Sequence, residues 1–192
     1  MAIKPILFNT EMVRAILDGR KSCTRRLVKF LSGENPRWTG YIKDELILYN
    51  GKNEPCIRKA PYQPGDILYV QETFIQIAAH TFWYKAYGKS WMLKDLRWKP
   101  SIHMPKEAAR IWLKVTDVRL ERLQEITIDG IRNEGLSSMA VHAGDMEIAL
   151  KEWELLWSST IKKSDLDLYG WDANPWVWVI EFERCEKPEG EN

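Results

Sequence analysis

The spacing of apolar positions predicts a strand, a helix and a tight turn at the start of the chain. Residues 2–8 are expected to form a first strand, and Pro5 places it near a sheet edge because proline cannot donate to an internal ladder. Over residues 10–17 the apolar side chains recur at the spacing of one helical face, with Thr10 as the expected N-cap. Gly19 then fits the left-handed position that ends many helices.

Strand-like patterns predict three further strands, at residues 67–74, 110–123 and 176–183. Within the second of these the parity of the apolar positions changes, so a bulge or sharp bend is expected near Thr116 and Asp117. In the last strand the two faces carry different residues. One face has Trp176, Trp178, Ile180 and Phe182, and the other has Val177, Val179, Glu181 and Glu183.

Helices are expected in the second half of the chain, and irregular structure before it. Thr127 is the expected cap of a short helix that Gly135 ends, and residues 145–158 carry the longest helical pattern. Residues 31–64 are rich in glycine and proline, so we interpret them as an insertion that holds a hairpin arm at 41–49.

The composition describes a folded, soluble chain. Of its 192 residues, 45% are hydrophobic and 29% are charged, which favours one domain with a real core. No apolar run reaches the roughly 18 residues of a membrane span, and the start of the chain lacks the apolar core of a signal peptide. We therefore expect a cytoplasmic protein that does not bind membranes.

The cysteine pattern points away from disulfide and metal chemistry. Cys23, Cys56 and Cys185 are odd in number without C-x-x-C spacing, and the three histidines are scattered, so we expect neither a metal site nor a cofactor. Cys23 has the opposite strand parity to Thr24. That position favours a small buried side chain over a nucleophile.

Positive charge is concentrated around the first turn. Residues 14–29 contain six basic residues and one acidic residue, so this window carries +5 while the whole chain carries +1. The simpler interpretation is that the cations complement the end of the preceding helix and otherwise form a solvated face. The alternative is a site. If Lys21 lies in the turn, then Thr24 and Arg26 share a face of the next strand and can meet one anionic or carbonyl-bearing ligand.

Ten tryptophans are an unusual number for a chain of this length. Aromatic rings stack on nucleobases, so a basic cleft with tryptophan walls would suit a nucleoside or a short single strand. For any one tryptophan, a place in the core is the more common outcome.

One stretch of the sequence has a family signature. Residues 16–26, ILDGRKSCTRR, resemble the first motif of the ASCH-domain family, small barrels similar to RNA-binding PUA domains, in which a G-R-K-x-x-T-x-R segment lines a cleft. The whole pattern is most similar to ASCH-domain proteins encoded by phages and prophages. The other segments that agree are Pro64–Val70, Ile111–Val118 with the later Glu134-Gly135 pair, the PSIHMP stretch that ends at Pro105, and NPWVWVIEF at Asn174–Phe182.

The resemblance implies an α+β fold, namely a PUA-like small mixed β-barrel with flanking helices and inserted loops. It implies one domain over residues 1–186, followed by a frayed tail at 187–192. The characterised enzymes of the family are much shorter than this chain. The extra length is expected as insertions near residues 27–60, 73–103 and 137–173.

The resemblance also implies a set of catalytic residues. Amidohydrolases of the family remove the acetyl group from N4-acetylcytidine with a lysine, a threonine and a glutamate, which map by motif position to Lys21, Thr24 and Glu134. A lysine removed from water beside other cations gives up its proton more readily and can activate a threonine hydroxyl. A carboxylic acid can then protonate the leaving amine. The implied activity is a metal-independent amide hydrolysis.

Four further residues are candidate contacts to the substrate: Arg20, Arg26, Glu72 and His103. Glu72 lies on the polar side of its strand, where it can pair with Arg26 or Lys21, or equally with another group on the surface. We expect the partner to be a nucleoside or a short single strand of RNA or DNA, because a nearly neutral chain suits few phosphates. The alternative to hydrolysis is a non-catalytic or nuclease-like RNA-binding or DNA-binding module.

Overall fold

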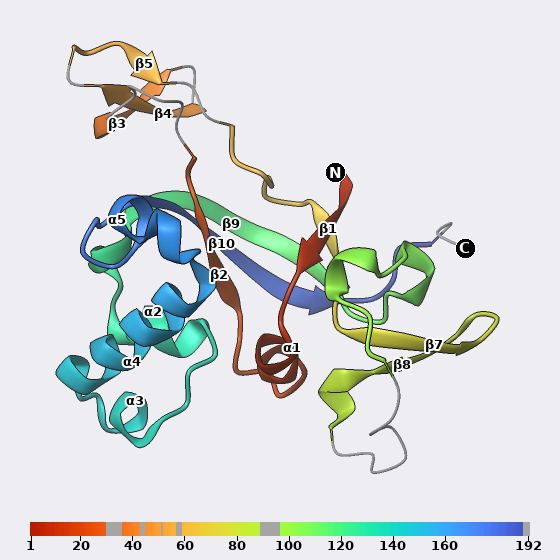
Figure 1. The fold of residues 1–192 in the computed structure, drawn as a ribbon. Helices are drawn as coiled ribbons and strands as arrows, with labels where there is room; N and C mark the ends of the chain where they lie inside the picture. Colours follow the sequence, from red (N-terminus) through yellow and green to blue (C-terminus); the bar gives the residue numbers. More distant parts are fainter. Residues whose placement is uncertain (30–35, 43–44, 51, 57–58, 89–96, 190–192) are drawn as a thin grey trace.

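A five-stranded mixed sheet is the centre of the protein (Figure 1). Its strands are β1 (Ile3–Leu7), β2 (Cys23–Leu27), β6 (Ile67–Gln71), β9 (Trp112–Arg122) and β10 (Trp176–Cys185). They follow the order β1-β6-β9-β10-β2, in which β1 and β6 are parallel and the other pairs antiparallel. Helices accompany the sheet, so the fold is α+β as predicted. The structure, a computed structural model, describes residues 1–29, 36–42, 45–50, 52–56, 59–88 and 97–189.

Both faces of β10 are buried, which places this strand between two cores. Trp178 and Ile180 pack on one face together with helix α1 (Thr10–Leu17). Val177 and Val179 pack on the other face against a layer of helices. The alternation predicted for the last strand is therefore confirmed, and each of its two faces contributes to a different core.

The layer of helices covers the second core (Figure 1). Thr127 caps the first of them by accepting a hydrogen bond from Gly130 N at 3.1 Å, as predicted. Asp145 caps the longest helix, whose Trp153 and Trp157 are buried. In the described ranges no helix is long and apolar enough to cross a membrane. The helices are α2 (Ile128–Asn133), α3 (Met139–Ala143), α4 (Met146–Thr160) and α5 (Leu166–Tyr169).

Helix α1 begins with a different cap from the predicted one. The side chain of Asn9 accepts a hydrogen bond from Met12 N at 2.9 Å, so Asn9 is the N-cap and Thr10 is the first helical residue. Asparagine caps at least as well as threonine, and from this position its oxygen reaches the third N–H of the helix. Gly19 has a φ of +74° just after the C-cap Asp18, as predicted.

The bend predicted within residues 110–123 is present in β9. Along the ladder with β10, Asp117 faces Glu181 and Val115 faces Phe182, so Thr116 is an extra residue on the β9 side. An extra residue on one strand forms a bulge and increases the local twist. The bulge explains why the apolar parity changes in the sequence.

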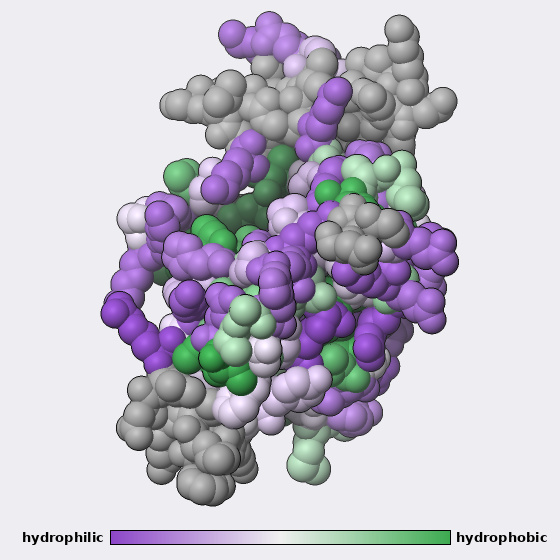
Figure 2. Space-filling view, turned by 90° about the vertical axis from the view of Figure 1, so that its right-hand side faces the viewer, coloured by the Kyte–Doolittle hydropathy of each residue, from purple (hydrophilic) through white to green (hydrophobic). Residues whose placement is uncertain are grey.

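Two of the predicted insertions contain small antiparallel sheets. One is formed by β3 (Pro36–Ile42), β4 (Glu45–Asn50) and β5 (Pro55–Cys56), and the other by β7 (Phe74–Ala78) and β8 (Thr81–Tyr84). The predicted hairpin arm corresponds to β3 and β4, and residues 43–44 between them lie outside the described residues. The strand predicted over 67–74 ends earlier, because the chain turns after β6 into β7. The face that carries β7 and β8 is mainly hydrophilic, with small separate hydrophobic patches (Figure 2).

The two outer strands of the main sheet are connected by a side chain. β1 and β2 stand at the two ends of the strand order, and in the part of the chain that the structure describes no ladder joins them. Arg26 of β2 donates from Nη2 to the carbonyl of Leu7, the last residue of β1, at 2.8 Å. Closure into a full barrel stays a prediction.

Candidate functional site

A buried ion pair joins Lys21 to Glu134. Lys21 Nζ donates to Glu134 Oε2 at 2.6 Å and to the Glu134 carbonyl at 3.0 Å, and the two side chains are 0% and 2% exposed. Removing two charges from water is costly, so such a pair needs good geometry and further hydrogen bonds. The structure thus brings together two of the three residues predicted to be catalytic.

Backbone contacts between the turn before β2 and the end of α2 explain why these residues meet. Lys21 and Glu134 form an isolated antiparallel bridge, and Ser22 N donates to the Asn133 carbonyl at 2.9 Å. Gly135 follows with a φ of +96°, and a Cβ at this position would collide with α1. A glycine is therefore required where the ends of α1 and α2 approach each other.

Arg25 is a second cation on Glu134, which the sequence analysis missed. Its Nη1 donates to Glu134 Oε1 at 3.3 Å and its Nη2 to Glu121 Oε2 at 3.0 Å, while the residue is 5% exposed. The guanidinium also lies 5.9 Å from the ring centre of Trp153. Strand parity was the available signal, because a residue two positions after the buried Cys23 lies on the same face.

Thr24, the third residue predicted to be catalytic, lies on the opposite face of β2 from Arg25. It pairs with Ile180 of β10 and is 1% exposed. Within the described residues its hydroxyl makes no hydrogen bond to Lys21 or Glu134. A substrate can reach this hydroxyl only if part of the surrounding chain moves.

Arg26 shares the face of Thr24 and is held at the end of β1. Besides its hydrogen bond to Leu7, its guanidinium lies 5.3 Å from the ring centre of Phe8, and Lys21 Nζ lies 5.6 Å from the same ring. Burial lowers the pKa of Arg26 below its ordinary value, and the negative charge of Glu134 opposes that change. The charged groups of two basic residues therefore lie near the single aromatic ring of Phe8. The sequence analysis placed Phe8 only as the last residue of the predicted first strand.

Glu72 pairs with Arg110 and not with Arg26 or Lys21. Two hydrogen bonds, at 2.8 and 2.9 Å, join the arginine to the buried carboxylate. Burial raises the pKa of Glu72, and the hydrogen bonds and charge of Arg110 oppose that rise. The strand order gives the reason, because Glu72 follows β6, whose neighbours are β1 and β9, and Arg110 precedes β9. His103 is exposed, and in the described part of the chain no hydrogen bond or ion pair joins it to Lys21.

The positive charge of residues 14–29 is largely neutralised by carboxylates. Arg20, for example, pairs with Asp18 at 2.8 Å and donates to the Gly135 carbonyl at 2.6 Å, so it contacts the backbone beside the site. Little of the +5 is therefore available to phosphate groups. The ion pairs are Arg14 with Glu11, Arg20 with Asp18, Lys21 with Glu134, and Arg25 with both Glu121 and Glu134.

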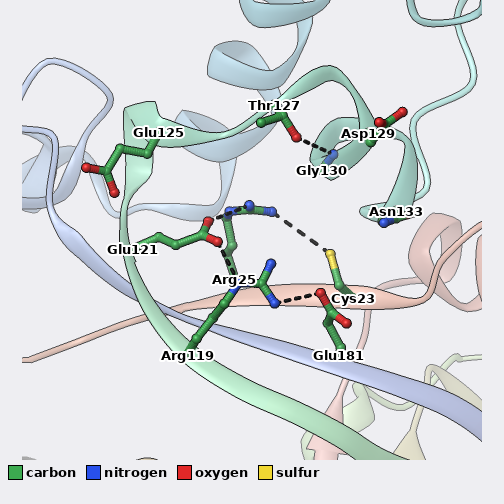
Figure 3. A pocket seen from close by; sticks show the side chains of 10 residues that line it. All are labelled: Cys23, Arg25, Arg119, Glu121, Glu125, Thr127, Asp129, Gly130, Asn133 and Glu181. Carbon is green, nitrogen blue, oxygen red and sulfur yellow. Dashed lines mark hydrogen bonds and ion pairs between the residues drawn. The ribbon is translucent and has the colours of Figure 1, made fainter. Parts of the chain in front are cut away.

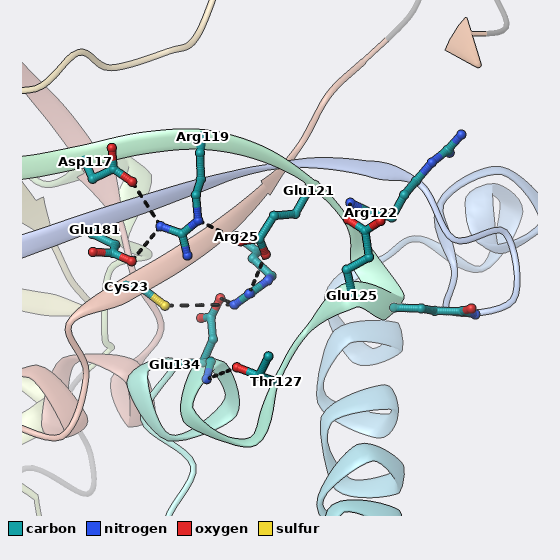
Figure 4. Close-up of polar contacts among 12 residues, drawn as sticks. Cys23, Arg25, Asp117, Arg119, Glu121, Arg122, Glu125, Thr127, Glu134 and Glu181 are labelled. Carbon is teal, nitrogen blue, oxygen red and sulfur yellow. Dashed lines mark hydrogen bonds and ion pairs between the residues drawn. The ribbon is translucent and has the colours of Figure 1, made fainter. Parts of the chain in front are cut away.

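A pocket of about 130 Å³ opens on the Arg25 face of the sheet (Figure 3). Arg119 lines it and donates to Glu121 at 2.7 Å and to Glu181 at 2.6 Å (Figure 4). Because Thr24 lies on the other face of β2, this pocket differs from the one predicted between Lys21, Thr24 and Arg26. Its lining residues are Cys23, Arg25, Arg119, Glu121, Glu125, Thr127, Asp129, Gly130, Asn133 and Glu181.

Cys23 lies in the pocket wall as a protonated thiol. Burial raises its pKa to about 12, the negative charge of Glu134 acts in the same direction, and the cations Lys21 and Arg25 oppose the rise. A thiol needs its deprotonated form to attack or to bind a metal, so Cys23 does neither in this state. In the described ranges no group of three His, Cys, Asp or Glu residues is arranged to hold a metal ion.

Two solved structures are similar to this one. The crystal structure of an ASCH domain from Lactobacillus crispatus JV V101 has a TM-score of 0.42 and 12% identity, covering 95% of this chain and 79% of that chain. The crystal structure of hypothetical protein PH0355 has a TM-score of 0.38 and 15% identity, covering 96% of this chain and 100% of that chain. No family model and no curated protein matches the sequence. Similarities this weak do not indicate an activity. The activity has to be inferred from the contacts described above.

Proposed function

We propose that this protein hydrolyses the amide of an N4-acylated cytidine nucleoside with Lys21, Thr24 and Glu134. The observation that carries the proposal is the buried 2.6 Å contact between Lys21 and Glu134, within a motif that resembles that of the ASCH-domain amidohydrolases. A lysine and a carboxyl group shielded from water are the base and the acid that amide hydrolysis requires.

Transfer of one proton within the ion pair produces both the base and the acid. When the proton moves from Lys21 to Glu134 across their contact, the pair becomes a neutral amine and a carboxylic acid. The amine accepts the proton of Thr24, whose oxygen attacks the acyl carbon. Glu134 then donates its proton to the nitrogen as the C–N bond breaks, and water hydrolyses the acyl-threonine to release the acid.

Release of acetate from N4-acetylcytidine tests the proposal. Thr24→Ala and Lys21→Ala should each abolish release, and the double variant should lose no more, because residues that act as a unit fail together. Thr24→Ser should keep part of the activity because the hydroxyl remains. Thr81→Ala, on the exposed hairpin strand β8, is the matched control and should leave release unchanged. Thermal unfolding of each variant checks that it is folded.

A binding module without catalysis is the second candidate. It is favoured by the burial of Thr24 and by the missing hydrogen bond from Thr24 to Lys21. A wild type that binds N4-acetylcytidine or a short RNA strand without releasing acetate would establish the module and end the hydrolase proposal. If Thr24→Ala weakens binding as much as turnover, the hydroxyl is a recognition contact. Affinity for RNA should depend weakly on salt, because few cations are left for phosphates.

A further inference from the structure

Glu134 is held by two cations, one on each carboxylate oxygen. Lys21 Nζ contacts Oε2 at 2.6 Å, and Arg25 Nη1 contacts Oε1 at 3.3 Å. The carboxylate cannot rotate without breaking one of these contacts. Figure 4 shows the Arg25 guanidinium lying between Glu134 and Glu121.

Arg25 is itself fixed by a chain of alternating charges. Glu121 accepts from Arg25 Nη2 at 3.0 Å and from Arg119 Nε at 2.7 Å. Arg119 Nη1 then reaches Asp117 at 3.0 Å and Glu181 at 2.6 Å. Glu121 also offsets part of the arginine's field, so Arg25 can orient the Glu134 carboxylate without being a lone positive charge beside it.

The rest of the Arg25 environment suits an apolar side chain. Its cross-strand partner is Val179, and the Trp153 ring lies beside the guanidinium. Arg25 Nε is buried and has no hydrogen-bond partner in the described part of the chain. A buried donor without a partner destabilises the fold, and an apolar residue would avoid that cost. Residues that break packing rules in this way are expected where a site requires them.

We propose that Arg25 is the positioning residue that directs the Glu134 carboxylate at Lys21. The inference rests on the proposed hydrolase function and names a residue outside the Lys21, Thr24 and Glu134 set. Arg25 touches no substrate atom. By holding Oε1 it leaves Oε2 for the proton exchange with Lys21 and for the leaving nitrogen.

The first test compares Arg25→Met, Arg25→Lys and Arg119→Met with the wild type on N4-acetylcytidine. Arg25→Met removes the charge and keeps a long side chain, so kcat should fall roughly ten-fold with KM nearly unchanged, as for the loss of an outer partner of a catalytic group. Arg25→Lys should recover part of kcat because it restores the cation. Arg119→Met makes the same change on the other partner of Glu121 but leaves both contacts of Arg25 in place, so it should lower kcat less than Arg25→Met does.

The second test measures position without activity. In crystal structures of Arg25→Met and the wild type, Glu134 Oε2 should leave hydrogen-bond distance of Lys21 Nζ in the variant alone. If Glu134 keeps this contact in the variant, or if its kcat equals that of the wild type, the inference is wrong. A wild type without turnover ends the hydrolase proposal, and the crystal comparison still decides the role of Arg25.

A fourth variant covers the case in which Arg25→Met does not fold. Glu121→Gln removes the charge that fixes Arg25 and leaves Arg25 itself in place. It should lower kcat with KM nearly unchanged and should lengthen the contact between Arg25 and Glu134 in the crystal. Wild-type kcat together with an unmoved Glu134 in Glu121→Gln would overturn the inference.

Discussion

Charged residues are buried in this protein only as members of ion pairs, within the residues that the structure describes. Lys21 and Arg25 share Glu134, while the other two buried carboxylates, Asp66 and Glu72, pair elsewhere. Removing one partner of such a pair leaves an uncompensated buried charge and typically costs about 3–5 kcal/mol. Burial of charge alone therefore does not identify a site. The Lys21 group is distinguished by its place in the motif and by its second cation.

Cys23 gives a prediction at the scale of one residue. With a pKa of about 12, on the order of one thiol in ten thousand is ionised near pH 8. Iodoacetamide should therefore modify Cys23 of the folded protein far more slowly than Cys185, which is half-buried. Mass spectrometry of peptides after timed quenching measures both rates. In denaturant the two rates should become similar, and equal rates in the folded protein would show that the Cys23 thiol is accessible and ionised.

At the scale of elements, the site depends on the close approach of α1 and α2. The amides of Arg20 and Lys21 both donate to the Ala15 carbonyl, at 2.8 and 3.0 Å, which folds the turn back onto α1. A Cβ on Gly135 would lie 2.8 Å from Ala15 Cβ and 3.1 Å from Lys21 Cβ. Small side chains at two positions thus permit the contact that places Glu134 beside Lys21.

Gly135→Ala tests this approach. The left-handed φ and the collision with Ala15 should together destabilise the protein by about 1–3 kcal/mol, measured by urea unfolding. Gly65→Ala is the matched control, because Gly65 also has a positive φ but has no atom within 4 Å of the added Cβ, so it should cost less. Ala15→Gly added to Gly135→Ala should recover part of the difference. If Gly135→Ala and Gly65→Ala lower the free energy of unfolding equally, the close approach of α1 and α2 is not what requires a glycine at position 135.

At the scale of the whole molecule, one carboxylate joins β1 to the start of β6, its neighbour in the main sheet. Asp66 accepts hydrogen bonds from Ala2 N at 2.9 Å, from Lys4 Nζ at 2.7 Å and from Gln63 N at 3.1 Å. Burial by itself would raise the pKa of Asp66, but these hydrogen bonds and the charge of Lys4 outweigh it and hold the pKa below its usual value. The carboxylate form is thus favoured by folding.

Acid should weaken the protein partly through Asp66. The folded state binds a proton at Asp66 less readily than the unfolded chain does. The stabilisation that Asp66 contributes is therefore fully present above about pH 4, and it is lost as the pH falls through the lowered pKa of the folded state. Asp66→Asn should cost roughly 1–3 kcal/mol at neutral pH and should lose less Tm on acidification than the wild type. Asp129→Asn, in an exposed pair with Arg132, should change little. Parallel curves of Tm against pH for the wild type and Asp66→Asn would contradict this account.

Local pattern was enough to predict much of the fold. The two faces of β10, the bulge at Thr116, the Thr127 cap and the left-handed Gly19 all follow from residues within a few positions of one another. Alternation, capping and the conformational freedom of glycine act over such distances, so they can be read from the sequence. The motif likewise pointed to Lys21 before any contact was known.

Contacts between distant segments were decided only by the tertiary structure. The sequence did not show that Arg25 would contact Glu134 or that Glu72 would pair with Arg110. It also did not show that Lys21 and Arg26 would both lie near the ring of Phe8. Each choice depends on strand order and on how the helices cover a sheet face. An ionised side chain also pairs with whichever opposite charge shares its buried space, and that neighbour is set by packing across the whole chain.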